Sequence, residues 1–386
     1  MNPTPPTGPL ADALARFPLV PPVPARTALP LEQRVGELSA LADRAAGDGD
    51  LDAAAEVHRL AAELYFDLWL PGSAYALCSL HSHRYLQHRP LGPVLAERAV
   101  EPQLLHADLL IRAGQPVTAA RLLTAISDAI GAGTDAEAAA VGTLPLAGIT
   151  ATAVGRDVLQ EWWDQAALKT LVRALARSGD WEQARLIALA GRPLPPGPYD
   201  SVQVATIALA LGGQHEIAAA RLARVRLDPR TPWEHVVVAA LTVACTLIGG
   251  QADEKVLTGQ LVALCDAHDT YQPGANPEFD AELTLTTADL CNAAGKQAVA
   301  DRLYEIAAGW ALEAQEGYSA RAVLRHHLAV RLPDAARQEL SAIAEHAGLG
   351  AGSLPPALSE QLTAAPDRAA EAITAALADD DPSPRP

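Results

Sequence analysis

The residues best suited to chemistry lie close together in the stretch YALCSLHSHRYLQHRP, residues 75–90. This stretch holds Cys78 and three histidines, in a chain that has 4 cysteines and 11 histidines. Thiolates and imidazoles are the preferred ligands of zinc, and the same two groups can act as a nucleophile and its base. The stretch therefore raises three hypotheses: a metal site, a catalytic pair, or a helix packed against its neighbours.

The helical register of this stretch separates its histidines. At 100° per residue, Cys78, His81 and Tyr85 share one stripe, whereas His83 lies on the opposite face. His88 belongs to the stripe but lies about 10 Å along the helix axis from His81. Cys78 and His81 alone are close enough to share an ion, and the sequence offers no obvious third ligand. The pattern favours packing, with a ligand groove and a metal or catalytic site as the alternatives.

Three other groups of residues have types that occur in functional sites. Trp162 and Trp163 are neighbours about 100° apart on a helix, so we expect one to pack between helices and the other to reach a groove. His326 and His327 point to different faces for the same reason, which argues against a shared metal. Residues 265–282, CDAHDTYQPGANPEFDAE, read as the longest polar connection, and their acids do not match calcium-loop spacing. We interpret this segment as a plain connection, with a functional loop as the alternative.

The elements that carry these residues are predicted to be helices. Hydrophobic residues make up 49% of the 386-residue chain but aromatic residues only 4%, because alanine and leucine supply most of the apolar content. Alanine and leucine favour helices, whereas the β-branched and aromatic residues that favour strands are comparatively few. We therefore expect an almost all-α protein.

Five segments share a pattern of helix, short turn and helix. Each has a glycine in the turn, an alanine five residues later, and a further residue four positions beyond the alanine. The glycines are Gly49, Gly114, Gly179, Gly213 and Gly295. The alanines are Ala54, Ala119, Ala184, Ala218 and Ala300, and the third positions are His58, Leu123, Ala188, Leu222 and Tyr304. Glycine ends the first helix, the alanine permits close approach of the two helices, and the third residue fills the core.

The clearest segment, LVRALARSGDWEQARLIALAG, resembles the tetratricopeptide repeat (TPR) family. Leu171 and Leu175 match its first-helix core positions, Gly179 its turn and Ala184 its small contact. The family has a 34-residue unit, which is the interval from Gly179 to Gly213. The two earlier intervals between turn glycines are 65 residues each, so we expect an extra helix or a degenerate unit in each. The resemblance implies a right-handed α-superhelix of TPR-like hairpins over residues 31–346.

The ends of the chain differ from the repeats. Residues 1–30 are rich in proline and predict an extended arm, with a short turn at ADALARF. Residues 347–379 predict one or two capping helices that begin at prolines and cover the last apolar face. Residues 380–386 read as a disordered tail.

Charge and cysteine usage narrow the function classes. The formal net charge is −17, and the scattered basic residues do not form the cluster that a nucleic acid or an anionic membrane needs. No CxxC pair occurs, no secretory signal begins the chain, and no apolar stretch reaches the roughly 18 residues of a membrane span. We expect a cytoplasmic protein.

The resemblance implies that a concave groove, lined mainly by the first helix of each pair, holds a peptide or a partner protein. The acidic surface favours a basic or amphipathic partner. The candidate groove residues are Tyr75, Cys78, His81, Tyr85, His106, Trp163, Arg173 and Arg177. The prediction is a non-catalytic scaffold or adaptor that needs no cofactor and no metal. The alternatives are an effector-sensing accessory protein of a regulatory or biosynthetic system, and a helical enzyme with a site near Cys78 and His81.

Overall fold

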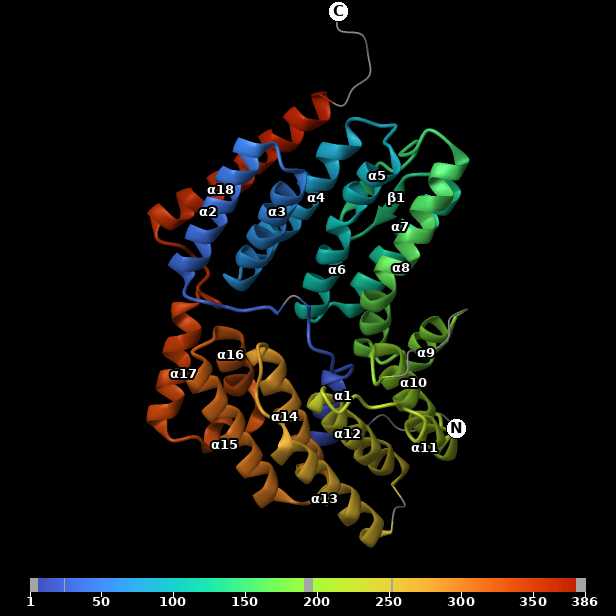
Figure 1. Cartoon of the computed structure of the whole chain (residues 1–386), viewed down its shortest axis with the longest axis vertical. Helices are drawn as coiled ribbons and strands as arrows, with labels where there is room; N and C mark the ends of the chain where they lie inside the picture. Colours follow the sequence, from blue (N-terminus) through green and yellow to red (C-terminus); the bar gives the residue numbers. More distant parts are fainter. Residues whose placement is uncertain (1–5, 24, 191–196, 251–252, 380–386) are drawn as a thin grey trace, which may run out of the picture. The chain divides into compact units, whose positions relative to one another are not determined.

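The chain folds almost entirely into helices, and most consecutive helices pack against each other as hairpins (Figure 1). The computed structural model describes residues 6–23, 25–190, 197–250 and 253–379. Within these ranges, the sheet consists of one short hairpin. The prediction of an all-α protein is confirmed.

The packing divides the chain into two compact units. Unit 1 comprises Met1–Leu29 and Leu175–Ala347, and unit 2 comprises Pro30–Ala174 and Gly348–Pro386. The chain therefore passes between the units three times. The boundaries of these units differ from the predicted order of an arm, a repeat domain and a cap. Unit 1 combines the arm with the later part of the repeat domain, and unit 2 combines the earlier part with the capping segment.

The elements of unit 2 come from both parts of its chain. They are α2 (Leu31–Asp48), α3 (Leu51–Asp67), α4 (Pro71–Leu86), α5 (Pro93–Val100), α6 (Pro102–Arg112), α7 (Pro116–Ala132), β1 (Ala136–Ala138), β2 (Gly142–Leu144), most of α8 (Ala153–Arg177) and α18 (Pro356–Asp379). Those of unit 1 are α1 (Pro9–Arg16), α9 (Trp181–Leu189), α10 (Asp200–Leu211), α11 (His215–Leu222), α12 (Pro232–Gly249), α13 (Glu254–Thr270), α14 (Pro277–Ala293), α15 (Gln297–Ala314), α16 (Gly317–Arg325), the 3-10 helix η1 (His327–Arg331) and α17 (Asp334–His346).

The five hairpin turns singled out in the sequence share one geometry. Each turn glycine has a positive φ, and in each turn the next residue donates its N–H to the carbonyl five positions earlier, as from Asp180 to Leu175. This 6→1 hydrogen bond is typical of a glycine-terminated helix. All five contact alanines are completely buried, and all five residues four positions later are buried as well. The predicted hairpin pattern is confirmed at these turns.

The C-terminal helix α18 belongs to the core of unit 2. It runs without interruption through Pro366 and packs against α2 and α3, so the end of the chain (red in Figure 1) lies beside the first hairpin (blue). Its Leu362, Ile373 and Leu377 are buried in that core. The helix therefore covers the first hairpin of the predicted repeats, whereas the sequence placed a cap on the last one.

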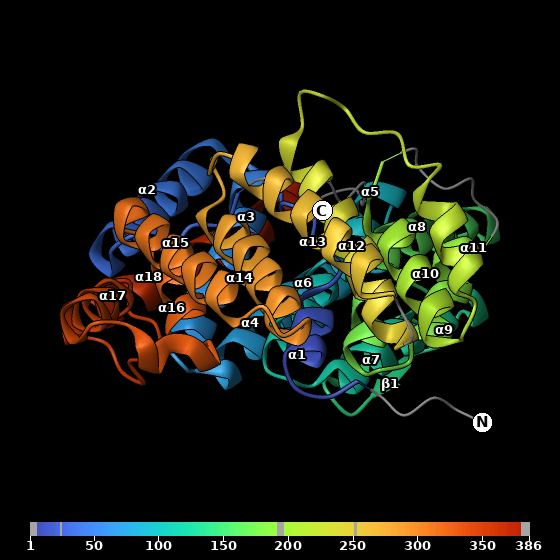
Figure 2. The same ribbon diagram turned by 90° about the horizontal axis from the view of Figure 1, so that it is seen from below.

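The proline-rich segment at the start of the chain contains a helix, α1, where the sequence predicted an extended arm with a short turn. Figure 2 shows α1 beside α14, against which it packs. Ala13, Leu14 and Phe17 are buried there. The apolar side chains of this segment thus find partners in unit 1 that lie far away in the sequence.

The two long intervals between turn glycines differ in structure. The first holds the additional helices α4 and α5, as expected. In the second, residues 133–152 form the β1–β2 hairpin and a loop instead of a helix. Gly142 and Gly148 have positive φ there, and Pro145 lacks an amide donor, so the local sequence opposes a helix.

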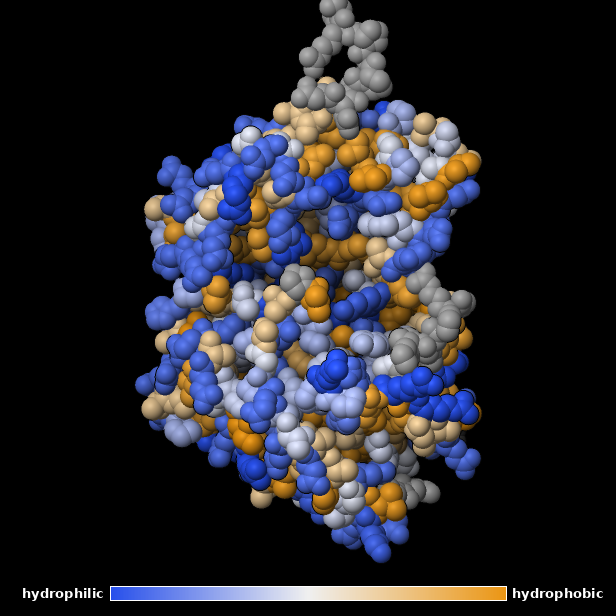
Figure 3. All heavy atoms as spheres, viewed as in Figure 1, coloured by the Kyte–Doolittle hydropathy of each residue, from blue (hydrophilic) through white to orange (hydrophobic). Residues whose placement is uncertain are grey.

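Among the described residues, α12 is long and apolar enough to cross a membrane by length and composition alone. Its Val236, Val237, Ala240 and Leu241 are completely buried in the core of unit 1. Packing therefore accounts for its apolar face. On the face of the molecule drawn in Figure 3, hydrophilic side chains surround scattered apolar patches.

Candidate functional site

Unit 2 contains a pocket of about 430 Å³ that is lined by α3, α4, α6 and α8. Its apolar lining comes from Ala55, Leu77, Cys78, Pro102, Leu104 and Leu105. This volume lies in the range of pockets for small ligands or one or two side chains of a peptide. The pocket is therefore large enough to bind a ligand and small enough to select among ligands.

Two histidines from neighbouring helices lie in the wall of this pocket. Nδ1 of His58 is 2.8 Å from Nδ1 of His81, and Nε2 of His58 is 3.0 Å from the carbonyl oxygen of Pro366. Because a carbonyl only accepts, Nε2 of His58 carries the proton and its Nδ1 accepts the N–H of His81. Nε2 of His81 is then the unprotonated ring nitrogen. The pair thus leaves one neutral acceptor, Nε2 of His81, in a residue that lines the pocket.

Burial keeps both imidazoles neutral. Burial, together with the smaller effects of the neighbouring His58 and Arg98, lowers the pKa of His81 to about 3. Burial also lowers the pKa of His58, although the hydrogen bond to Pro366 opposes that shift. Neither ring carries a positive charge near neutral pH, so the histidines do not repel a cationic ligand.

Cys78 lies beside His81 in the pocket wall but is not activated. Burial raises the pKa of its thiol to about 12, so the thiol is protonated near neutral pH. A thiol is a poor nucleophile and a poor metal ligand compared with the thiolate. The lowered pKa of His81 makes its unprotonated nitrogen a weak base, so His81 does not activate Cys78.

Acidic side chains dominate the charge of the pocket. Asp52, Glu56, Glu101 and Asp108 contribute four carboxylates, and Arg59 contributes one guanidinium. Arg59 is already bonded to Glu56 at 2.6 Å and to Glu63 at 2.9 Å. The excess of negative charge favours a cationic group in the ligand.

The structure brings together only part of the predicted groove set. Cys78 and His81 line the pocket, while Tyr75 is half-buried and stacks on His106 with ring centroids 4.6 Å apart. Tyr85, His106 and Trp163 have no exposed surface. They are packing residues in this structure, which corrects their assignment to a groove. The neighbour Trp162 is the partly exposed member of its pair.

The two predicted arginines do not line the pocket. Arg173 is half-buried on α8, with Nη1 3.8 Å from the pocket residue Asp108. Arg177 is exposed and belongs to unit 1 rather than to the unit that holds the pocket. The helical register placed these two residues one turn apart, but it could not show that the units divide between Ala174 and Leu175.

His326 and His327 do not lie on one helix, contrary to the prediction from the sequence. Helix α16 ends at Arg325 and His326 has extended backbone, so the two rings do not point to separate faces of one helix. Their centroids are 4.3 Å apart, and His326 also stacks on Tyr304.

The segment 265–282 is also more ordered than predicted. Only residues 271–276 lie outside helices, and Tyr271 donates a hydrogen bond to Asp280 across them.

Sequence reasoning missed His58 as a partner of His81, although it had placed His58 at the core position of the first hairpin. A polar residue at a position that is apolar in other hairpins was the available signal. The rim carboxylates gave no such signal, because isolated acids on helices usually lie on solvated faces.

Comparisons of the chain with models of protein families, with curated proteins and with solved structures found no match.

Proposed function

We propose that this chain is a non-catalytic helical-repeat binding protein, whose unit-2 pocket holds a basic or amphipathic segment of a peptide or partner protein. The observation that carries the proposal is an apolar pocket of about 430 Å³ bordered by four carboxylates and one guanidinium. A TPR-like arrangement of the hairpins is part of the same proposal and is supported by the five equivalent turns.

The charges around the pocket can be rearranged by a cationic ligand. Asp52 is bonded to Arg98 at 2.6 Å, and Asp108 lies 3.8 Å from Arg173. Glu101 is exposed at the rim, where the positive charge of Arg98 acts on it as well as on Asp52. A lysine or arginine side chain entering the pocket would pair with Glu101, while its aliphatic part covers Leu104 and Leu105.

The state of Cys78 and His81 favours binding over catalysis. A nucleophilic cysteine needs a lowered pKa and a base within hydrogen-bond reach. Cys78 has a raised pKa, and the lowered pKa of His81 makes its ring a weak base. Both groups are therefore better suited to lining a pocket than to forming a covalent intermediate.

The experiment is a fluorescence-polarisation screen of the full chain with two labelled peptide pools of equal length and equal leucine content. One pool is rich in lysine and arginine, and the other is rich in aspartate and glutamate. We expect saturable binding from the basic pool alone, with affinity that falls as salt rises. Glu101→Gln should weaken binding and flatten the salt dependence, because rim charges act mainly through electrostatic attraction. Equal binding of both pools would contradict the proposal.

A second candidate, an effector-sensing accessory protein, is favoured by the volume of the pocket, which also suits a small organic cation. Binding of a small amine to the same pocket, without binding of either peptide pool, would favour this second function.

A further inference from the structure

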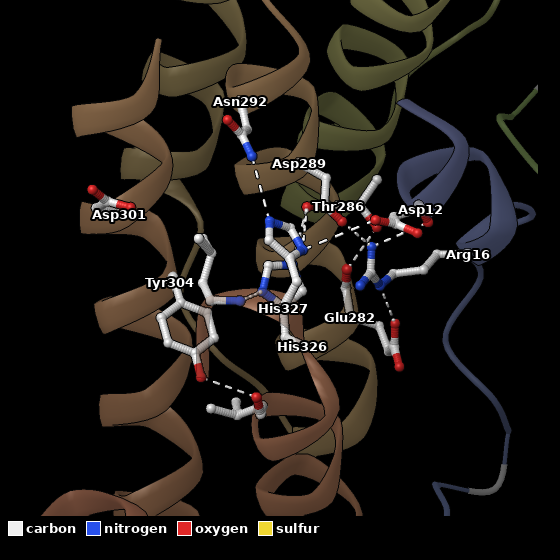
Figure 4. Close-up of polar contacts among 12 residues, drawn as sticks. Asp12, Arg16, Glu282, Thr286, Asp289, Asn292, Asp301, Tyr304, His326 and His327 are labelled. Carbon is white, nitrogen blue, oxygen red and sulfur yellow. Dashed lines mark hydrogen bonds and ion pairs between the residues drawn. The ribbon is translucent and has the colours of Figure 1, made fainter. Parts of the chain in front are cut away.

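A polar cluster in unit 1 joins three segments that lie far apart in the sequence. Asp12 comes from α1, Asp289 from α14, and His326 and His327 from the junction of α16 and η1 (Figure 4). One ligand atom from each of Asp289, His326 and His327 lies within 4.8 Å of the others. Asp289 and His326 are buried, whereas the side chains of His327 and Asp12 are 39% and 55% exposed. The cluster is therefore anchored inside and open to solvent on one side.

We propose that Asp12, Asp289 and His327 bind a divalent first-row metal ion of the zinc type. The site goes beyond the proposed binding function, because it lies in the other unit and shares no residue with the pocket.

The hydrogen bonds of His326 define its part in the site. Nδ1 of His326 accepts the backbone N–H of Leu328 at 3.3 Å, so in the neutral ring the proton lies on Nε2. Nε2 is 3.0 Å from Oδ1 of Asp289 and donates to it. His326 is thus a positioning residue for Asp289 rather than a ligand, which is a common arrangement behind a metal-binding carboxylate.

Asp289 keeps one electron pair free for a metal. Its Oδ2 accepts a hydrogen bond from Nη1 of Arg16 at 2.5 Å. Its Oδ1 accepts one bond, from His326, and has a second lone pair. This oxygen lies 3.7 Å from Nδ1 of His327, which in turn lies 3.9 Å from Oδ2 of Asp12. In a tetrahedral zinc site with bonds of about 2.0–2.2 Å, ligand atoms are roughly 3.3–3.5 Å apart. The distances from Nδ1 of His327 to the two carboxylate oxygens therefore exceed the ligand spacing of a zinc site by only a few tenths of an ångström, and the 55% exposed side chain of Asp12 can turn toward Asp289 to complete the set.

The second nitrogen of His327 fits the same assignment. Nε2 lies 3.4 Å from Nδ2 of Asn292. A 180° rotation of the Asn292 amide would bring its oxygen to this position, where it would accept the Nε2–H of His327 and leave Nδ1 unprotonated toward the two carboxylates. Figure 4 shows His327 between Asn292 on one side and Asp12 and Asp289 on the other.

The charge of the cluster matches a divalent cation. Asp12, Glu282 and Asp289 are acidic, and Arg16 is the basic group bonded to the latter two. With neutral imidazoles, three carboxylates and one guanidinium leave two excess negative charges. One imidazole with two carboxylates suits zinc better than magnesium or calcium, which prefer oxygen ligands alone. Three protein ligands leave one coordination position for water. Because these ligands come from three segments, the bound ion would link α1, α14 and η1 to one another.

The test is titration calorimetry of the full chain with zinc chloride after treatment with chelator and dialysis. We expect one equivalent to bind with micromolar or tighter affinity, and magnesium chloride to give no binding. His327→Ala and, separately, Asp12→Asn should each weaken zinc binding by at least about tenfold. His346→Ala changes an exposed histidine of the same unit and should leave the affinity unchanged.

A melting curve provides a second measurement. Zinc should raise the melting temperature of the wild type and of His346→Ala but not that of His327→Ala. Both substituted site residues are partly exposed, so far-UV circular dichroism of the variants should match that of the wild type. The proposal is overturned by an absence of zinc binding to the wild type. It is equally overturned if His327→Ala and Asp12→Asn bind zinc as tightly as the wild type does.

Discussion

At the scale of single residues, the buried His81 of the unit-2 pocket makes the stability of the protein depend on pH. The pKa of His81 is lowered to about 3 in the folded protein, mainly by burial. In the unfolded chain a histidine titrates near 6.5. Below pH 6.5, His81 therefore binds a proton in the unfolded chain, whereas its buried ring stays unprotonated in the folded protein. This contribution to stability is fully present above pH 6.5 and is lost as the pH falls toward 3.

His81→Gln should reduce the acid sensitivity of the free energy of unfolding. Glutamine can still donate a hydrogen bond to His58 but does not titrate. We expect the variant to be less stable at pH 7, because the smaller side chain packs less well. Between pH 7 and pH 5 it should lose about 2 kcal/mol less than the wild type. Urea unfolding at both pH values measures this difference, and equal losses for the two proteins would contradict the assignment of a neutral, buried His81.

At the scale of elements, the small contact after each turn sets the distance between paired helices. In the α10–α11 hairpin this contact is Ala218, which is completely buried, whereas Ala220 on the same helix is exposed. Because protein interiors are close-packed, a larger side chain at Ala218 must push the helices apart.

Ala218→Leu should destabilise unit 1 by about 1–3 kcal/mol through overpacking. Ala220→Leu makes the same change on the solvent face and should alter stability by no more than about 0.5 kcal/mol. Chemical unfolding followed by circular dichroism compares the two variants. Equal effects would mean that Ala218 does not form the helix contact that we describe.

The hairpins could be predicted from the sequence because their signals are local. A turn glycine, an alanine five residues on and a core residue one turn further all lie on one continuous segment. The predictions that were wrong concern features that depend on contacts between distant segments of the chain. His326 adopts extended backbone, and α1 is helical because apolar partners from α12 and α14 cover it. The pocket likewise joins His58 to His81 and the carboxylates of other helices, and no periodicity encodes which helices become neighbours.

At the scale of the whole molecule, each unit is built from separate parts of the chain. Unit 2 needs Gly348–Pro386 as well as Pro30–Ala174. The backbone N–H groups of Gly350 and Gly352 donate to the carbonyls of Asp67 and Leu68, which holds the returning segment against the end of α3. Helix α18 then completes the core over the first hairpin.

Ending the chain at Ala347 should therefore unfold α2 and α3 while leaving α14 and α15 folded. The truncation removes the buried Leu362, Ile373 and Leu377, each worth about 1.5–3 kcal/mol. Their sum is comparable with the total stability of about 5–15 kcal/mol of a typical protein. Hydrogen exchange measures protection helix by helix, and a chain ending at Asp379 serves as the control. Full protection of α2 and α3 in the shorter chain would show that α18 is dispensable for unit 2.

Matched arginine substitutions test most directly whether the unit-2 pocket is the binding site. Ala55→Arg puts a bulky cation into that pocket, whereas Ala219→Arg makes the same change in a pocket of about 690 Å³ in unit 1. The measurement is the equilibrium affinity of each variant for the basic peptides. We predict that Ala55→Arg lowers the affinity at least about tenfold and that Ala219→Arg leaves it unchanged. Wild-type affinity in Ala55→Arg, or loss of affinity in Ala219→Arg alone, would contradict this account.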